Sequence, residues 1–149
     1  MMLALVRPDS WNFPLFLHVL GAMVLVGSTG AVAVLALATR KRQAQGELLS
    51  RLAFRTLIFV VVPSWIVMRL GAQLIVDKEF SGKAPGWVGV GFVVSEPGLI
   101  LLIALGVLAW VSARRGGVGR ASVALAILTP VYLAALAVAW WAMSAKPGA

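Results

Sequence analysis

Long apolar segments alternate with short polar ones along this chain. Residues 10–39 and 121–145 contain no Asp, Glu, Lys or Arg, and each segment exceeds the roughly 20 residues that a helix needs to cross a bilayer. Residues 56–76 and 87–113 are also apolar, and each is interrupted by one ionisable residue, Arg69 and Glu96. The pattern predicts an all-α membrane protein, a single transmembrane domain over residues 1–149, with helices at about 12–39, 52–76, 87–113 and 121–144.

Prolines fall near the middle of the last three predicted helices, at Pro63, Pro97 and Pro130. A proline removes one backbone hydrogen bond and frees the carbonyl four residues earlier. In a membrane that carbonyl needs a partner or must face protein or a water-filled cavity. One such proline is an ordinary kink, whereas three at similar depth favour a widening at the centre of the bundle.

The third segment has two interpretations. In the first, which we favour, one kinked helix runs from Trp87 through Pro97. In the second, Ser95 caps a helix, Glu96 lies near its positive end and Pro97 occupies its first turn. Residues 87–94 would then form an extracytoplasmic or re-entrant stretch.

The charges predict an orientation. Basic residues gather between the first and second helices and between the third and fourth, and both loops are therefore expected in the cytoplasm. They are Arg40, Lys41, Arg42, Arg51 and Arg55 in the first loop, and Arg114, Arg115 and Arg120 in the second. The charges of residues 77–83 sum to zero, and the outer ends carry Trp11, Trp87, Trp140 and Trp141, as an aromatic belt would. We expect an antiparallel bundle with both termini extracytoplasmic.

Composition agrees with this class of protein. Hydrophobic residues make up 61% of the chain and charged residues 12%, far from the balance of a soluble domain. The net charge of +8 is explained by the cytoplasmic loops, so the expected partner is the lipid bilayer and not nucleic acid. The chain has no cysteine and no phosphate-loop, dinucleotide or HExxH motif, which argues against an enzyme, catalytic residues and a metal site.

One polar side chain from each helix falls in a common layer. Counted at about 1.5 Å per residue, His18 and Arg69 lie about 9 and 10 Å below the outer helix ends, and Glu96 and Tyr132 about 13 Å. Ionisable residues in membranes are costly and usually find partners inside the bundle. We therefore predict an outward-facing polar pocket with an Arg69–Glu96 ion pair. Its residues are His18, Arg69, Glu96, Tyr132 and Trp65, with Gln73 lining the entrance.

Each of these residues also has a structural interpretation. Arg69 can extend to the outer headgroups, Glu96 can serve as a helix-start residue, and His18 can donate to a neighbouring carbonyl. For the pocket, the predicted functions are binding or transport of a small ligand, with Arg69 attracting an anionic group, or a redox role with haem or quinone. The third alternative is an accessory subunit, in a homo-oligomer or a larger membrane complex, docked through the small residues Gly21, Gly27, Gly30 and Ala31.

The stretch LHVLGAMVLVGSTG, residues 17–30, resembles the first-helix pattern L-H-x-x-G-x-x-x-x-x-G of several small bacterial membrane families. These are the copper-resistance protein D type, the protoporphyrinogen-oxidase J type and an uncharacterised four-helix family, which fits best in length. His18, Gly21 and Gly27 match the pattern, whereas Val26 stands where an aromatic residue often precedes the later glycine. The resemblance implies a multi-pass protein of the bacterial inner membrane.

The oxidase J resemblance also implies haem chemistry at His18. The chain has one histidine, so two histidines cannot bind one haem within a protomer. A b-type haem would need His18 alone, His18 with a methionine, of which Met68 is the better placed, or two His18 side chains across a dimer.

Overall fold

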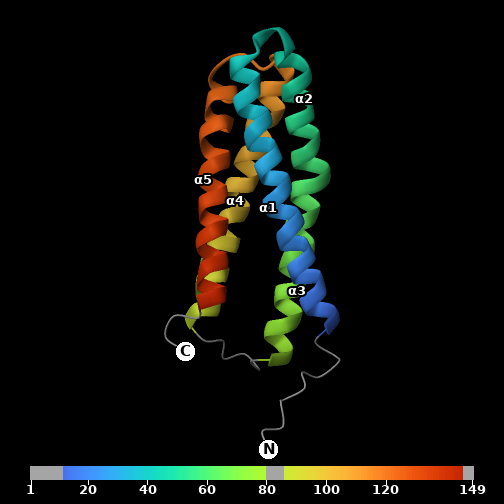
Figure 1. The fold of residues 1–149 in the computed structure, drawn as a ribbon, viewed down its shortest axis with the longest axis vertical. Coiled ribbons are helices and arrows are strands. Elements are labelled where there is room, and N and C mark those ends of the chain that lie inside the picture. Colours follow the sequence, from blue (N-terminus) through green and yellow to red (C-terminus); the bar gives the residue numbers. More distant parts are fainter. Residues whose placement is uncertain (1–11, 80–85, 146–149) are drawn as a thin grey trace, which may run out of the picture.

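A computed structural model describes residues 12–79 and 86–145, and these residues form helices and turns with no strand (Figure 1). Four helical stretches are long and apolar enough to cross a membrane, as predicted: Asn12–Lys41, Gln43–Lys78, Gly91–Arg114 and Arg120–Ala145. The elements are the α-helices α1 (Asn12–Lys41), α2 (Gly46–Thr56), α3 (Val62–Glu79), α4 (Gly86–Arg114) and α5 (Arg120–Ala145), the 3-10 turn η2 (Gln43–Gln45) and the π-helical turn η3 (Leu57–Val61).

Helix α4 decides between the two interpretations of the third segment. It is continuous from Gly86 to Arg114 with Pro97 inside it, so the alternative helix start at Ser95 is wrong. A continuous helix loses only the one hydrogen bond that Pro97 cannot donate. A non-helical stretch over residues 87–94 would expose many unpaired backbone groups, which lipid cannot satisfy.

The second membrane segment begins at α2, several residues before the predicted start, and continues through η3 into α3. The amide of Val62 donates to the carbonyl of Leu57, five residues earlier, so the helix is locally wider just before Pro63. This wider turn gives the proline ring room beside the preceding carbonyls. The Ser64 hydroxyl donates to the carbonyl oxygens of Val60 and Val61, which supplies a polar partner inside the segment.

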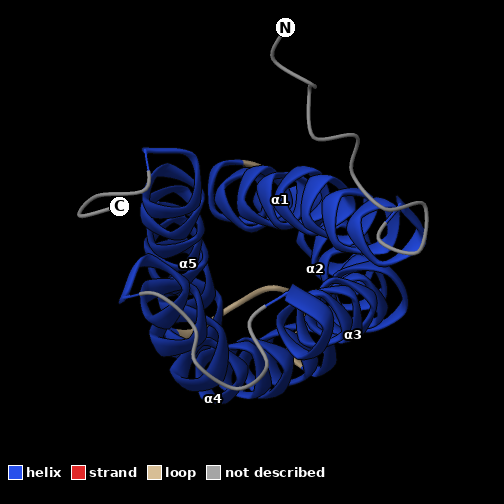
Figure 2. Cartoon of the chain, turned by 90° about the horizontal axis from the view of Figure 1, so that it is seen from below, coloured by secondary structure: helices blue, strands red, loops and turns tan. Residues whose placement is uncertain are grey.

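The helices pack as two pairs, α1 with α3 and α4 with α5, and the packing of α1 on α5 joins the pairs. Helix α1 packs mainly on α3 and also on α2 and α5, while α4 packs on α5 and on α2. Viewed along the bundle, α1, α3, α4 and α5 form a ring (Figure 2). The α1/α3 pair and the α4/α5 pair diverge toward the end where α1 begins and α5 ends (Figure 1). We call this end the far end.

The turns between α1 and α2 and between α4 and α5 meet at the opposite end (Figure 1). Gly117 has a φ of +81°, and a Cβ on it would overlap the backbone of Gly46, so only glycine allows the two turns to touch. We call this the basic end, because the basic residues of both predicted cytoplasmic loops lie in or beside these turns.

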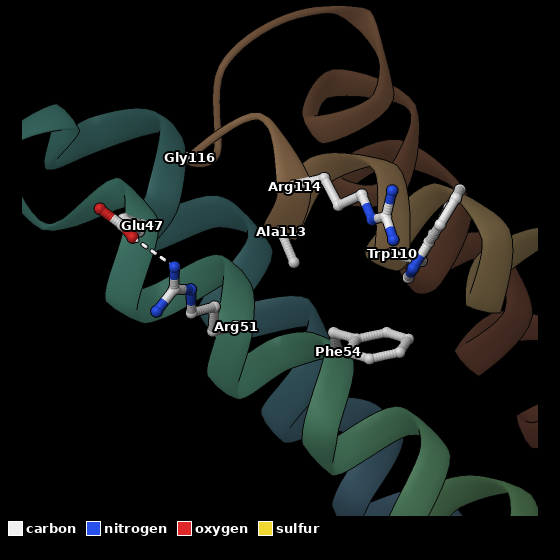
Figure 3. Close-up of a pocket in the computed structure, with 7 residues that line it drawn as sticks. All are labelled: Glu47, Arg51, Phe54, Trp110, Ala113, Arg114 and Gly116. Atoms are coloured by element: carbon white, nitrogen blue, oxygen red, sulfur yellow. Dashed lines mark ion pairs between the residues drawn. The ribbon is translucent and has the colours of Figure 1, made fainter.

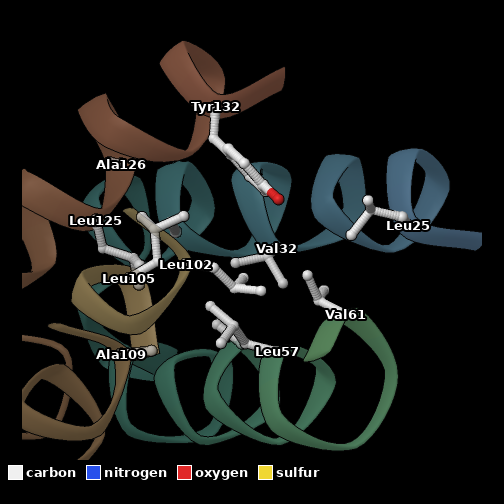
Figure 4. Packing of buried hydrophobic residues seen from close by; sticks show 12 residues of the cluster. Leu25, Val32, Leu57, Val61, Leu102, Leu105, Ala109, Leu125, Ala126 and Tyr132 are labelled. Atoms are coloured by element: carbon white, nitrogen blue, oxygen red, sulfur yellow. The ribbon is translucent and has the colours of Figure 1, made fainter. Parts of the chain in front are cut away.

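The core is mostly aliphatic, and its buried residues come from α1, α2, η3, α4 and α5 (Figure 4). It contains Leu25 and Val32 from α1, Leu57 and Val61 from η3, Leu102 and Leu105 from α4, and Leu125 and Tyr132 from α5. Helix α3 contributes partly buried side chains that pack against the core, among them Trp65 and Met68. Many other large apolar side chains, among them Met23, Phe59 and Ile100, are exposed. In a soluble protein such a surface would aggregate, whereas lipid covers it in a membrane.

Candidate functional site

His18 lies where α1 and α3 touch. Its Nδ1 atom is 3.0 Å from the carbonyl oxygen of Met68. A carbonyl oxygen only accepts, so Nδ1 carries the proton and donates. A Cβ on Gly21 would overlap the backbone of Met68, and a Cβ on Gly71 would overlap the backbone of His18. The structural interpretation of His18, a hydrogen bond to a neighbouring carbonyl, is therefore confirmed.

Arg69 is the centre of a second cluster, between α3 and α4. Its Nη2 atom lies 3.5 Å from Glu96 Oε1, which confirms the predicted ion pair. The guanidinium also lies over the Phe92 ring, 4.6 Å from its centroid. Only 23% of the Arg69 side chain is exposed, against 68% for Glu96. Arg69 is therefore held between the helices, and the carboxylate faces the surface of the bundle.

The Arg69 cluster continues along α3 toward the far end. Arg69 Nη1 donates to Gln73 Oε1 over 3.0 Å, and Gln73 Nε2 donates to Asp77 Oδ1 over 2.9 Å. Trp65, Arg69, Gln73 and Asp77 follow one another at four-residue spacing and share one face of the helix. We call these four residues the polar stripe of α3. Sequence reasoning assigned Asp77 to the loop and missed its place here, because the four-residue spacing reaches Asp77 only when the helix continues beyond Val76, as α3 does.

Three buried polar atoms in the same half of the bundle have no hydrogen-bond partner among the described residues: Trp65 Nε1, Ser95 Oγ and Tyr132 Oη. Tyr132 is 1% exposed, and its ring extends from α5 into the core (Figure 4). A Cβ on Gly98 would lie 3.3 Å from the ring, so the tyrosine packs against α4 one turn from Ser95. A fourth such atom, Ser122 Oγ, belongs to the first turn of α5 at the basic end.

The predicted pocket residues thus divide into three groups. Arg69, Glu96 and Gln73 are in contact, and Trp65 packs against the core cluster that contains Tyr132. His18 is bonded to Met68 in the α1–α3 contact instead. Sequence reasoning did not include Ser95 in the pocket, because it considered this serine only as a possible helix cap.

A haem held by both His18 and Met68 does not fit this arrangement. The porphyrin would have to lie between the two side chains, but the backbones of α1 and α3 touch at Gly21 and Gly71. Within residues 12–79 and 86–145, no group of three His, Asp or Glu side chains could hold a metal ion.

Two surface cavities of about 600 and 330 Å³ are lined by residues of the basic half, and none of the predicted pocket residues lines either one. Comparison with known proteins found no matching family model, no similar curated protein and no similar solved structure. The first-helix resemblance therefore stays a prediction, and function is inferred from the geometry of the polar stripe and the residues around it.

Proposed function

We propose that this protein is a membrane-embedded binding or transport unit for a small anionic solute, which it takes up between α3, α4 and α5 in the half of the bundle near the far end. The Arg69 cluster is the observation that carries the proposal. An arginine within a membrane segment is costly, and here its one ionic partner among the described residues is an exposed carboxylate, that of Glu96.

Arg69 suits the recognition of an anion. Its guanidinium presents several donors in a planar fork, which matches a carboxylate or phosphate better than an ammonium does. Gln73 and Phe92 hold the arginine in place, so little side-chain freedom is lost when a ligand binds. An incoming anion competes with Glu96 for the guanidinium, and protonation of Glu96 would release Arg69. Binding of the anion would thereby be linked to binding of a proton.

The buried polar atoms support the same site. Burying an N–H or O–H group without a hydrogen-bond partner costs free energy. Trp65 Nε1, Ser95 Oγ and Tyr132 Oη come from three different helices. A ligand or water that enters along the polar stripe would give these groups the partners that the protein itself does not.

The proposed orientation is an antiparallel bundle with the basic end in the cytoplasm and the far end outside. The positive-inside rule supports it, as do the exposed Trp140 and Trp141 near the end of α5. Trp11 of the predicted aromatic belt lies outside the described residues. In this orientation, Asp77 and Gln73 would meet an arriving solute first and Arg69 next.

Thermal unfolding in mild detergent tests ligand binding directly. Acetate, lactate, succinate and inorganic phosphate are the probes. At a concentration of about 100 times its dissociation constant, a ligand raises the free energy of unfolding by about 2.7 kcal/mol. We expect at least one probe to raise the melting temperature of the wild type and of Arg55→Gln, but not that of Arg69→Gln. A panel with no effect on the wild type, or an equal effect on Arg69→Gln, would contradict the proposal.

Uptake of the stabilising probe into proteoliposomes tests the proton linkage. We expect an inward proton gradient to accelerate uptake by the wild type. Glu96→Gln, which cannot be protonated, should show uptake that no longer responds to the gradient. Uptake by Glu96→Gln that still follows the gradient would refute the role of Glu96 in proton exchange.

A further inference from the structure

The larger of the two cavities lies at the basic end, between α2 and α4 (Figure 3). Its volume is about 600 Å³, which is within the range of small-molecule sites. The lining residues are Glu47, Arg51 and Phe54 from α2, Trp110, Ala113 and Arg114 from α4, and Gly116 from the following turn. The cavity is therefore formed where the two cytoplasmic loops of the predicted topology meet.

Two guanidinium groups border the cavity from opposite sides (Figure 3). Arg114 lies over the Trp110 ring, 4.3 Å from its centroid, so its direction is fixed by stacking. Arg51 lies 2.5 Å from Glu47, in an ion pair whose side chains are 62% and 64% exposed. An exposed ion pair of this kind is weak, so a stronger anion can displace Glu47. Two arginines against one carboxylate leave the cavity with an excess positive charge.

The position of the cavity along the bundle favours a lipid as the source of that anion. Arg114 is the last residue of the candidate span Gly91–Arg114, the level at which headgroups lie in the proposed orientation. Val107 and Ile103 follow Trp110 toward the middle of α4 at three- and four-residue spacing, and both are more than half exposed. An apolar surface therefore continues from the cavity toward the bilayer core on one face of α4.

We propose that this cavity binds the phosphate group of an anionic phospholipid. Arg51 and Arg114 contact the phosphate, because guanidinium groups form charge-assisted hydrogen bonds with phosphate oxygens. Trp110 lies beside the glycerol backbone, and the acyl chains lie over Val107 and Ile103. This site is separate from the proposed solute site at Arg69, and neither requires the other.

Native mass spectrometry of the delipidated, full-length protein in mild detergent tests the proposal. The probes are phosphatidylglycerol, phosphatidylcholine and inorganic phosphate. We expect one phosphatidylglycerol to be retained in preference to phosphatidylcholine, whose phosphate is already balanced by its own cation. Excess inorganic phosphate should not displace the bound lipid, because it cannot use the apolar surface of α4. Displacement by inorganic phosphate at a similar concentration would overturn the lipid assignment.

Matched arginine variants separate a defined site from general attraction of anions. Arg51→Gln/Arg114→Gln and Arg55→Gln/Arg115→Gln remove the same charge from neighbouring positions, but only the first pair lines the cavity. We expect retention of phosphatidylglycerol to fall about fivefold for each arginine removed from the cavity, to stay unchanged in the control pair, and to rise in Glu47→Gln. Equal losses in the two double variants would overturn the proposal. All five residues are exposed, and melting curves of the variants verify that they fold.

Discussion

The hydrogen bond between His18 and the Met68 carbonyl shows how a single residue can link two helices. An imidazole in an apolar segment needs a hydrogen bond, and the Met68 carbonyl provides it because Gly71 lets the α1 backbone approach α3. The sequence shows that His18 needs a partner but not which one, since the accepting atom is a backbone oxygen 50 residues away. Any residue at position 68 would offer the same atom, so no side-chain pattern could identify it.

Replacing His18 by alanine should therefore destabilise the fold. We expect the free energy of unfolding to fall by about 0.6 kcal/mol and by no more than about 1.7 kcal/mol, the average and the maximum measured for hydrogen bonds between membrane helices. Met23→Ala is the control, because Met23 is on the same helix and is 69% exposed. Denaturant titration in mixed micelles gives both values. A loss for His18→Ala no larger than that for Met23→Ala would rule out a stabilising role for the hydrogen bond.

At the scale of the helices, the packing of one helix against another determines which polar side chains are in contact. The Arg69–Glu96 pair could be predicted, because two opposite charges in neighbouring apolar helices reduce each other's cost of insertion. The continuation to Asp77 and the π turn before Pro63 could not be predicted as readily. The first depends on where α3 ends, and the second depends on how one helix accommodates a proline ring.

Exchanging the two charges tests this contact. Arg69→Glu and Glu96→Arg each place like charges together, so we expect both single variants to unfold at a lower temperature than the wild type. The double exchange should recover part of the loss, measured as the interaction energy of a double-mutant cycle. Gln73 and Phe92 remain fitted to an arginine at position 69, so recovery should be incomplete. No recovery at all would indicate that the pair contributes nothing to stability.

The close contact between α1 and α3 can be tested independently of the Arg69–Glu96 ion pair. A methyl group on Gly21 or Gly71 would meet the backbone of the opposite helix, whereas Gly27 has open space around it. Gly21→Ala and Gly71→Ala should lower the free energy of unfolding by about 1–3 kcal/mol, the cost of overpacking. Gly27→Ala should be close to neutral, and equal losses at all three glycines would contradict this account of the packing.

At the scale of the whole molecule, the apolar segments were sufficient to predict four membrane helices. A helix can cross the membrane if it is long enough and apolar enough, and both properties can be read from one continuous segment of the sequence. The cavity at the basic end could not be predicted in this way. It depends on α2 packing against α4 and on two turns meeting through Gly46 and Gly117, and no single segment carries that information.

The proposed solute site requires that the polar residues between α3 and α4 are open to water and anions from the outer side. The chain has no cysteine, so single cysteines can be probed in intact cells with a membrane-impermeant anionic thiol reagent, which reacts only with a hydrated thiolate. Gln73→Cys and Ser95→Cys report on the site. The matched control is Val93→Cys, an apolar position on the same helix as Ser95 that is 70% exposed.

We predict that Gln73→Cys and Ser95→Cys are modified from outside and that Val93→Cys is not. The modification of Ser95→Cys should also slow when Arg69 is replaced by glutamine, because the positive charge that attracts the reagent is then absent. If Ser95→Cys reacted no faster than Val93→Cys, the polar residues would be closed to the outside and the proposed solute site would be contradicted.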